Sequence, residues 1–453
     1  MARKIVMEEV LIDDFEFPNK GSGYWEDKKI TVKNAIPGQT VKVSIKKKKH
    51  KYEGRLLEII EKAEYEIKSE CDNFGICGGC TFHNISYEKE LELKKSNVLK
   101  LLGQLNLENY EFLGIKGSPD INAYRNKMEF SFGDTGVDGE LSLGMRKRES
   151  YYEVINADNC LIIDEDVRRI VKCVRDFFKD SKDTFYHKTK RTGTLRHLLV
   201  RKAFFTGEII VNLITTNGLK TDISTLKDLL LDINFNGKLV GFIHTLNESV
   251  ADIVRADQVR VLFGQDYFME KLLGLNFKIS VFSFFQTNSQ GAEILYLQIR
   301  DFIGDVSEKV VFDLYCGTGT IAQIMAEKAK KVIGVELVEE AVAAAVTNTM
   351  LNKIKNCEFI VGDVLKIIDE ISEKPDVIVL DPPREGIHPK AIGKIIRFAA
   401  EKIVYLSCKA SSMVRDLEVM IENGYEVEKV VCVDMFPRTY HVETVCLLTR
   451  KPQ

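Results

Sequence analysis

The hydrophobic and polar positions change their period along the chain, and the clearest pattern covers residues 276–453. Short apolar runs at 310–315, 331–336, 357–361, 377–380 and 403–407 alternate there with stretches of helical periodicity, such as 320–329 and 339–352. This alternation predicts parallel strands joined by crossover helices, which is a doubly wound α/β sheet. Ligands of such sheets bind at the carboxyl ends of the strands.

Residues 1–62 show short β-rich segments instead, at 4–10, 29–32, 40–47 and 54–60, separated by turn signals such as Pro37-Gly38. This spacing predicts a small OB-like β-barrel. The most basic stretch is consecutive and consists of Lys46, Lys47, Lys48, Lys49, His50 and Lys51. Such a run is either a solvated hairpin tip or a contact for phosphates, and a barrel with a basic loop is a common form of RNA contact.

Residues 63–275 are less regular and predict a central α+β domain. They begin with clustered cysteines and a helical pattern at 87–105, and β-rich segments follow at 127–132, 198–205 and 209–215. Basic residues recur in this stretch, and we expect two of them, Arg125 and Lys127, to contact RNA phosphates. Such contacts raise the affinity for RNA without deciding which site is chosen.

The composition limits the function classes. Of the 453 residues, 45% are hydrophobic and 29% are charged, and the formal net charge is −3, so a nucleic-acid site would be a local basic patch. No apolar run is long enough to cross a membrane, and acidic residues stand where a signal peptide would be apolar. We expect a cytoplasmic monomer without an obligate protein partner, in which the ten cysteines are thiols, metal ligands or nucleophiles.

A cofactor site is predicted where the first apolar run of the C-terminal stretch meets a glycine turn, Tyr315-Cys316-Gly317-Thr318-Gly319-Thr320. The turn lacks the Lys of a phosphate loop and the third glycine of a dinucleotide-binding fingerprint. The next strand ends in Glu336, which is placed to accept hydrogen bonds from ribose hydroxyls, and a third ends before Asp363, which is placed at an adenine edge. Together with Asp381 on a fourth strand, this order of glycine turn and acids predicts a class I methyltransferase that uses S-adenosylmethionine.

Candidate catalytic residues follow two neighbouring strands. The segment Asp381-Pro382-Pro383-Arg384 has arginine where amine methyltransferases usually place an aromatic residue, which argues against amine chemistry. Cys408 follows the next strand, and it is either a nucleophile or an inert packing thiol. A thiolate that adds to C6 of uracil makes C5 nucleophilic towards a methyl sulfonium, and a base must then take the C5 proton. Glu443 and His441 are the candidates for that base.

Several motifs together resemble the 5-methyluridine RNA methyltransferases, over essentially the whole chain. They are Phe284-Phe285-Gln286-Thr287-Asn288, the glycine turn, Asp381-Pro382-Pro383-Arg384, Ser407-Cys408 with Arg415-Asp416-Leu417, and residues 434–443. The resemblance implies cofactor contacts for Gln286, Tyr315, Glu336, Asp363 and Asp381, and we count Thr320 with them. It also implies that Cys408 is the nucleophile and Glu443 the base, with Asp381 beside them. The family usually has Asn-Pro after the nucleophile, whereas this chain has Lys409-Ala410.

The first unit resembles a TRAM domain, and four cysteines also match the family. Cys71, Cys77 and Cys80 have C-x5-C-x2-C spacing, with Cys160 as a remote partner. Spacing alone fits either zinc or a four-iron cluster. The resemblance to the ribosomal RNA members implies a [4Fe–4S] cluster with a structural or RNA-positioning role. The remaining cysteines apart from Cys408 are interpreted as packing residues.

The sequence therefore predicts three domains, at 1–62, 63–275 and 276–453, in an enzyme that methylates C5 of a uridine. The barrel and the cysteines favour 23S ribosomal RNA as the substrate. Transfer RNA uridine, cytidine C5 and an exocyclic nitrogen are the alternatives. An iron–sulfur RNA-binding or radical protein is a further alternative, although radical enzymes usually present C-x3-C-x2-C, which this chain lacks.

Overall fold

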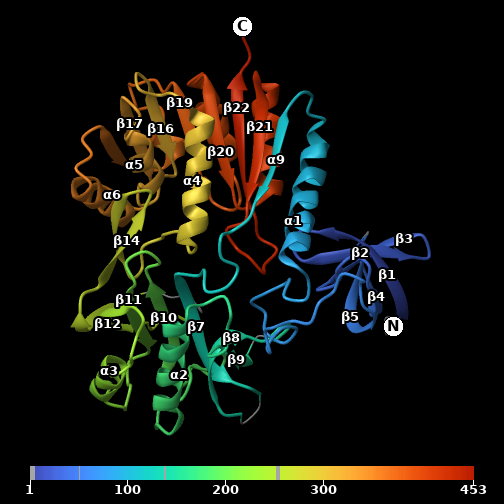
Figure 1. Cartoon of the computed structure of the whole chain (residues 1–453), viewed down its shortest axis with the longest axis vertical. Coiled ribbons are helices and arrows are strands. Elements are labelled where there is room, and N and C mark those ends of the chain that lie inside the picture. The colour runs from blue at the N-terminus through green and yellow to red at the C-terminus, as the bar shows by residue number, and fades with distance from the viewer. Residues whose placement is uncertain (1–5, 50, 137–138, 151, 251–255, 453) are drawn as a thin grey trace.

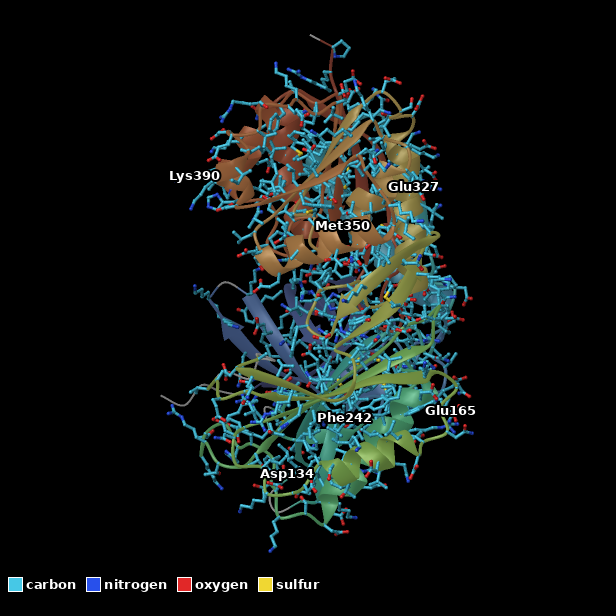
Figure 2. The ribbon with its side chains drawn as sticks, turned by 90° about the vertical axis from the view of Figure 1, so that its left-hand side faces the viewer. Asp134, Glu165, Phe242, Glu327, Met350 and Lys390 are labelled. Carbon is cyan, nitrogen blue, oxygen red and sulfur yellow. The ribbon has the colours of Figure 1, made fainter. Side chains whose placement is uncertain are left out.

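The computed structural model describes residues 6–49, 51–136, 139–150, 152–250 and 256–452. The chain forms a barrel and two large sheets, and the two sheets stand one above the other in Figure 1. The barrel lies beside the junction of the two sheets in both Figure 1 and the perpendicular view of Figure 2. Within the described ranges, no helix is long and apolar enough to cross a membrane.

The first five strands close into the predicted barrel, in the order β1-β2-β3-β5-β4. They are β1 (Val6–Glu16), β2 (Lys20–Trp25), β3 (Lys28–Lys33), β4 (Thr40–Lys48) and β5 (Lys51–Glu61). Alternate residues such as Val10, Val32 and Val43 fill the barrel, because side chains of a strand alternate between its two faces. The lysine run lies at the tip of the β4–β5 hairpin, except that His50 is outside the described residues.

The middle of the chain forms a seven-stranded sheet with the order β13-β12-β11-β10-β7-β8-β9. Its strands are β7 (Lys127–Asp134), β8 (Leu141–Arg146), β9 (Val154–Asn156), β10 (Leu195–Lys202), β11 (Glu208–Thr215), β12 (Lys238–Leu246) and β13 (Gln258–Gly264). Helices α2 (Glu165–Lys179) and α3 (Ser224–Leu231) pack against it. This arrangement confirms the mixed α/β character of the middle of the chain.

One strand boundary in this sheet differs from the sequence prediction. The apolar run 198–205 predicts a strand to its end, whereas β10 stops at Lys202. The backbone N–H groups of Phe204 and Phe205 donate to the carboxylate of Glu270, at 2.7 and 3.0 Å, in place of strand partners. A buried carboxylate that accepts two N–H groups therefore ends the strand.

The C-terminal half forms an eight-stranded sheet with the order β18-β17-β16-β19-β20-β22-β21-β6. Its strands are β16 (Val310–Leu314), β17 (Lys331–Glu336), β18 (Cys357–Val361), β19 (Val377–Leu380), β20 (Lys402–Ser407), β21 (Tyr425–Val433), β22 (Glu443–Arg450) and β6 (Glu111–Lys116). Strands β16 to β20 are parallel, as predicted, whereas β22 is antiparallel to β20 and β21. Their helices are α4 (Ser289–Ile303), α5 (Thr320–Ala326), α6 (Glu339–Leu351), α7 (Val364–Ile367), α8 (Pro389–Arg397) and α9 (Ala410–Glu422).

Two segments cross the predicted domain boundaries. Strand β6 belongs to residues 63–275 by position, yet it pairs in parallel with β21 at the end of the C-terminal sheet. Helix α1 (Tyr87–Leu102) and the short helix η1 (Gly103–Leu105) lead into it, and α1 runs alongside that sheet in Figure 1. The hairpin of β14 (Tyr267–Leu272) and β15 (Leu275–Ser280) spans the predicted boundary at residue 276. The division into three domains stays a prediction.

Candidate active site

Strand pairing places Cys408 next to Glu443. In the antiparallel pair of β20 and β22, Ser407 lies opposite Thr444, so the residue after Ser407 and the residue before Thr444 also face each other. Cys408 is half-buried, and burial raises the pKa of its thiol to about 11. Glu443 and Asp381 raise that pKa further, whereas Arg384 lowers it. The thiol therefore lies within electrostatic reach of two carboxyl groups and one guanidinium.

The carboxyl groups around Cys408 hold protons more tightly than usual. Burial raises the pKa of Glu443 to about 8, and Asp381 adds to the shift. Burial alone raises the pKa of Asp381 to about 7. Asp313 on β16 is fully buried, and its pKa rises to about 8 through burial and the proximity of Asp381. A group with such a pKa is able to accept and release a proton near neutral pH.

His441 has the opposite property. Burial and the nearby Arg384 lower the pKa of its imidazole to about 4. Its Nδ1 lies 3.5 Å from a guanidinium nitrogen of Arg384, which only donates, so Nδ1 accepts and the ring is neutral. Because a base with a low pKa takes up protons weakly, this environment favours Glu443 over His441 as the proton acceptor.

The cofactor residues of the prediction lie around the glycine turn at the carboxyl ends of β16 and β17. Glu336 accepts from the backbone N–H groups of Gly317 and Val338, at 3.0 and 2.9 Å. Tyr315 has a φ of 67°, a left-handed conformation that turns the chain sharply after β16. Thr320 is buried at the start of α5. No heavy atom lies within 4 Å of a Cβ placed on Gly317, so the turn has an open side that fits a ligand.

Asp363 and Gln286 complete the predicted set, and a tyrosine joins them. Asp363 caps α7 by accepting from the N–H of Leu365 at 2.9 Å. Gln286 makes a side-chain hydrogen bond with Tyr296, and Asp381, Asp313 and Glu443 all act electrostatically on that buried phenol. Tyr296 thus joins the cofactor side of the site to the catalytic carboxyl groups. No local sequence signal identifies Tyr296, because it occupies an apolar position of α4.

The pocket at Cys408 is a cavity of about 460 Å³ with walls from three parts of the chain. The barrel contributes Phe17 and Lys29, and α1 contributes Asn97 and Lys100. The remaining wall comes from loops of the eight-stranded C-terminal sheet and includes Arg384, Cys408, Lys409, Tyr440 and His441. A ligand that reaches Cys408 therefore touches the barrel as well as the methyltransferase sheet.

The segment that carries His441 and Glu443 is fixed by a buried ionic network. The amino group of Lys94 on α1 donates to Glu90 at 2.7 Å, to Asp434 at 2.8 Å and to the carbonyl of Phe436 at 3.2 Å. Lys94, Glu90 and Asp434 are all buried, so each charge depends on the others for compensation. Asp434 also accepts from Tyr87, at 2.9 Å. Local sequence patterns do not reveal this network, because its members are far apart in the chain.

The turn after Cys408 lacks the Asn-Pro pair of the family and is held by local hydrogen bonds instead. The hydroxyl of Ser407 donates to the carbonyl of Lys409 at 3.0 Å and accepts from its N–H at 3.1 Å. Helix α9 then begins at Ala410. Asp416 of α9 accepts from the N–H of Ile387 at 2.7 Å, which ties the loop after Asp381 to the same helix. Local hydrogen bonds therefore position the nucleophile candidate.

The four cysteines of the predicted cluster line one cavity of about 70 Å³. Burial raises the pKa of the thiols of Cys77, Cys80 and Cys160, the last to about 11. Arg125 lines the same cavity, and its buried Nε makes no hydrogen bond. In the described part of the chain, however, no three His, Cys, Asp or Glu side chains are arranged to hold a metal ion. The geometry brings the four residues together without confirming the predicted metal.

The predicted RNA contacts fall in two places. The side chains of Lys46, Lys47, Lys48 and Lys49 are exposed on the barrel. Lys48 pairs with Glu53 at 3.5 Å, so the hairpin tip is not purely basic. Lys127 pairs with Glu129 at 2.9 Å, and Arg125 points to the cysteine cavity. The barrel lysines are therefore better placed for phosphates than Arg125 is.

Comparisons with known proteins agree with this geometry. A family model described as tRNA (Uracil-5-)-methyltransferase matches residues 86–451. An uncharacterised RNA methyltransferase of Clostridium acetobutylicum is 51% identical, covering 100% of this chain and 99% of that protein. Another, from Caldanaerobacter subterraneus, is 49% identical, covering 97% and 98%. The crystal structure of Pyrococcus abyssi tRNA (uracil-54, C5)-methyltransferase with S-adenosyl-L-homocysteine aligns with a TM-score of 0.79 and 25% identity, covering 98% of this chain and 100% of that one.

The fold and the cofactor site define a class I methyltransferase that uses S-adenosylmethionine and acts on RNA. The chain belongs to the tRNA (uracil-5-)-methyltransferase family. The family model begins after the barrel and after three of the four clustered cysteines, whereas the full-length relatives cover both.

Proposed function

We propose that this enzyme methylates C5 of a uridine in RNA through a covalent bond between Cys408 and C6 of the base. The observation that carries the proposal is the pairing of β20 with β22, because it sets a thiol beside a buried carboxyl group. An enzyme that methylates an amine needs neither a thiolate nor a separate base at this place.

The residues divide the reaction between them. The thiolate of Cys408 adds to C6, and the electron pair of the C5–C6 bond moves into the uracil carbonyl as an enolate. S-adenosylmethionine would supply the electrophilic methyl group when it is bound, and the enolate electrons would form the new bond from C5 to that methyl group. Glu443 then takes the proton from C5, and the electrons of that C–H bond restore the C5–C6 double bond as the sulfur leaves C6. Arg384 is placed to stabilise the thiolate, because it lowers the pKa of Cys408.

The cofactor would be held by the residues around the glycine turn. Glu336 already accepts two backbone N–H groups, which orient its carboxylate for ribose hydroxyls. Asp363 is oriented by its capping bond, and Gln286 by its bond to Tyr296. Asp381 acts electrostatically on both Tyr296 and Cys408, so we assign it to both the cofactor and the catalytic residues.

We further propose that Cys71, Cys77, Cys80 and Cys160 bind a [4Fe–4S] cluster. Such a cluster takes its four thiolates at separate iron atoms, an arrangement wider than the shell of a single ion. Supporting observations are the shared cavity and the unbonded Nε of Arg125, a positive group that would offset thiolate charge. The cluster would be structural, since methyl transfer moves no unpaired electron.

For the substrate we propose 23S ribosomal RNA, in the cytoplasm, on the strength of the barrel and the clustered cysteines. Transfer RNA is the second candidate, because the Pyrococcus abyssi structure that covers 98% of this chain is named for a tRNA uridine. The two differ only in the RNA that reaches the pocket at Cys408.

The test is nucleoside mass spectrometry on RNA from a strain that lacks the gene. Ribosomal and transfer RNA are separated, incubated with the enzyme and S-adenosylmethionine, and digested. We expect 5-methyluridine to appear in the ribosomal fraction with the wild-type enzyme, and to be reduced at least about 1000-fold with Cys408→Ala. Methylation by that variant at the wild-type rate, or a product other than 5-methyluridine, would overturn the proposal.

A further inference from the structure

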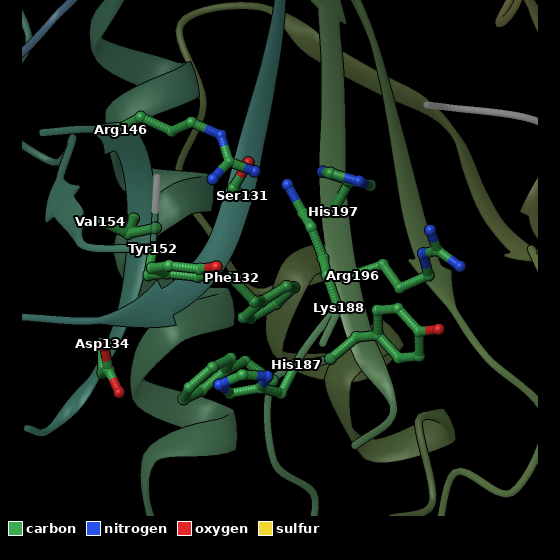
Figure 3. A pocket seen from close by; sticks show the side chains of 12 residues that line it. Ser131, Phe132, Asp134, Arg146, Tyr152, Val154, His187, Lys188, Arg196 and His197 are labelled. Atoms are coloured by element: carbon green, nitrogen blue, oxygen red, sulfur yellow. The ribbon is translucent and has the colours of Figure 1, made fainter. Parts of the chain in front are cut away.

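The seven-stranded sheet carries a second pocket, apart from both the catalytic cavity and the cysteine cavity. It measures about 70 Å³ and is shown in Figure 3. Its lining combines aromatic rings, among them Tyr152, Phe185 and Tyr186, with the cationic side chains Arg146, Lys188 and Arg196. Asp134 contributes a carboxylate, so positive groups outnumber negative ones.

Two rings of this pocket stand nearly parallel to each other. The ring centroids of Tyr152 and His187 are 6.0 Å apart, with an angle of 19° between the ring planes. Phe185 lies nearly parallel to His187, at 6.4 Å and 29°. A flat ring inserted between Tyr152 and His187 needs about 7 Å, twice the van der Waals distance, so the gap has to widen by about 1 Å.

The large ring of Tyr152 is 60% exposed. A tyrosine that served only to pack the domain would be covered, as Tyr124 is at 1% exposure. An exposed aromatic ring stacked beside a histidine offers a platform on which an unpaired base can stack, since every base has an apolar face.

Arginine and lysine extend the platform. The guanidinium of Arg146 and the amino group of Lys188 lie on the same side of the pocket, above the two rings in Figure 3. Arg196 is held in the wall by bonds to the carbonyls of Asn247 and Ser249, at 2.9 and 2.7 Å, and stacks on Tyr186 at 4.5 Å. The rings suit a base, and the two cations suit its phosphate.

Strand β7 connects this pocket with the methyltransferase site. Asn126, just before β7, donates to the carbonyl of Gln286 at 2.8 Å and to Ser289 at 2.9 Å. Ser131 of the pocket lies five residues further along, which is about 17 Å of strand. The pocket therefore lies about one strand length from the residues that hold Gln286, a separation that a few nucleotides of extended RNA span.

We propose that this pocket binds a second unstacked nucleotide of the RNA substrate, with its base against Tyr152 and His187 and its phosphate at Arg146 and Lys188. The pocket would then select RNAs that present two unpaired bases at a fixed separation. This inference rests on the proposed function for the identity of the polymer, but not for the chemistry at Cys408.

The test compares Tyr152→Ala, Tyr152→Phe and Met350→Ala, each in the Cys408→Ala background so that RNA binds without turnover. Met350 is a matched control, because it is 72% exposed on α6 of the other sheet. We expect affinity for ribosomal RNA from the deletion strain to fall about tenfold with Tyr152→Ala and to stay within about twofold for the other two variants. Lys188→Gln should lower the slope of log Kd against log salt by about 0.7.

A second readout locates the nucleotide. Ultraviolet crosslinking followed by mass spectrometry should yield a nucleotide on the peptide that contains Tyr152 or His187. Equal affinities for all variants, or crosslinks confined to other peptides, would overturn the proposal. The same binding assay on transfer RNA shows which of the two RNA classes the pocket prefers. Absence of 5-methyluridine in the product would refute the proposed reaction without changing the order of affinities among these variants.

Discussion

Burial raises the pKa of the thiol of Cys408 and of three clustered cysteines, Cys77, Cys80 and Cys160, yet the neighbours of the two sites differ. Cys408 faces Glu443, Asp381 and Arg384 at the edge of a large cavity. The four clustered cysteines line one small cavity together with Arg125. The surroundings of Cys408 suit chemistry on a bound molecule, whereas the proposed role of the clustered cysteines is to share a ligand.

The largest effect should come from removing the proton acceptor at the first site. Glu443→Gln keeps the shape of the side chain but cannot take the C5 proton, so turnover should fall by about 10²–10⁴-fold. Methylated RNA should remain attached to Cys408, because the sulfur leaves only after that proton is lost. Gel shift under denaturing conditions and mass spectrometry detect the adduct. If His441→Gln traps the adduct instead, His441 is the base.

The next largest effect should come from disrupting the buried ionic network of Lys94, which helps to join the clustered cysteines to the segment before Glu443. Thr81 and Phe82, directly after Cys80, donate to the carbonyl of Arg438, and the Lys94 network holds the same segment from α1. Lys94→Met leaves two buried carboxylates without their cation, so the free energy of unfolding should drop by about 3–5 kcal/mol.

Lys89→Met is the matched control for Lys94, since it removes a lysine from the same helix whose contacts are an exposed pair with Glu92 and a cation–π contact with Tyr65. Such a pair contributes about 0.2–1 kcal/mol. Urea denaturation followed by circular dichroism measures both variants. Equal losses of stability would show that the buried network does not hold the segment in place.

The pH dependence should separate catalysis from stability. Cys408 must be ionised to attack and Glu443 to accept a proton, and their pKa values are raised to about 11 and about 8. The rate should therefore rise about tenfold per pH unit above pH 8 and more steeply below it. Stability should change in the opposite direction. Because folding raises the pKa values of Asp381 and Glu443, protonation of these groups favours the folded state. This contribution is complete below about pH 4 and is lost as pH rises through about 7–8.

Initial rates and melting temperatures between pH 6 and 9 measure the two trends. In Glu443→Gln the fall of stability with pH should become shallower, because one of the groups that loses its proton is gone. A wild-type rate that is independent of pH over this range would contradict the role of Glu443.

The smallest effect on activity should come from changing the clustered cysteines. Cys80→Ser should abolish iron binding and absorbance near 400 nm, while the turnover number at saturating RNA changes by less than about tenfold. Cys408→Ala should show the reverse, with full absorbance and no activity. Cys173→Ala, a half-buried cysteine outside both sites, should change neither. A protein without iron in any variant would refute the cluster and leave the catalytic proposal intact.

Sequence patterns predicted the parallel half of the sheet well, because short buried strands end in turns and acids that are visible locally. Strands β17, β18 and β19 have the bounds that the apolar runs predict. The far edge of this sheet was not predicted, because nothing local in the segment of β6 shows that it pairs with β21 more than 300 residues later. The Lys94 network and Tyr296 were missed for the same reason.

The candidate site shows the same limit. Cys408 and Glu443 were identified separately, by strand position and by family resemblance, and only the pairing of β20 with β22 shows that they are neighbours. For the clustered cysteines, spacing predicted that they meet, and they do share a cavity. Spacing does not determine the sulfur positions that a shared ligand requires.

The central claim is that Cys408 forms a bond to C6 of uracil, and RNA containing 5-fluorouridine tests it most directly. Fluorine at C5 cannot be removed as a cation, so the reaction should stop at the covalent complex. We predict one RNA bound per enzyme, stable to denaturation, dependent on S-adenosylmethionine and attached to Cys408 in the digested peptide. Normal methylation of uridine without any such adduct, or an adduct on another residue, would contradict the account.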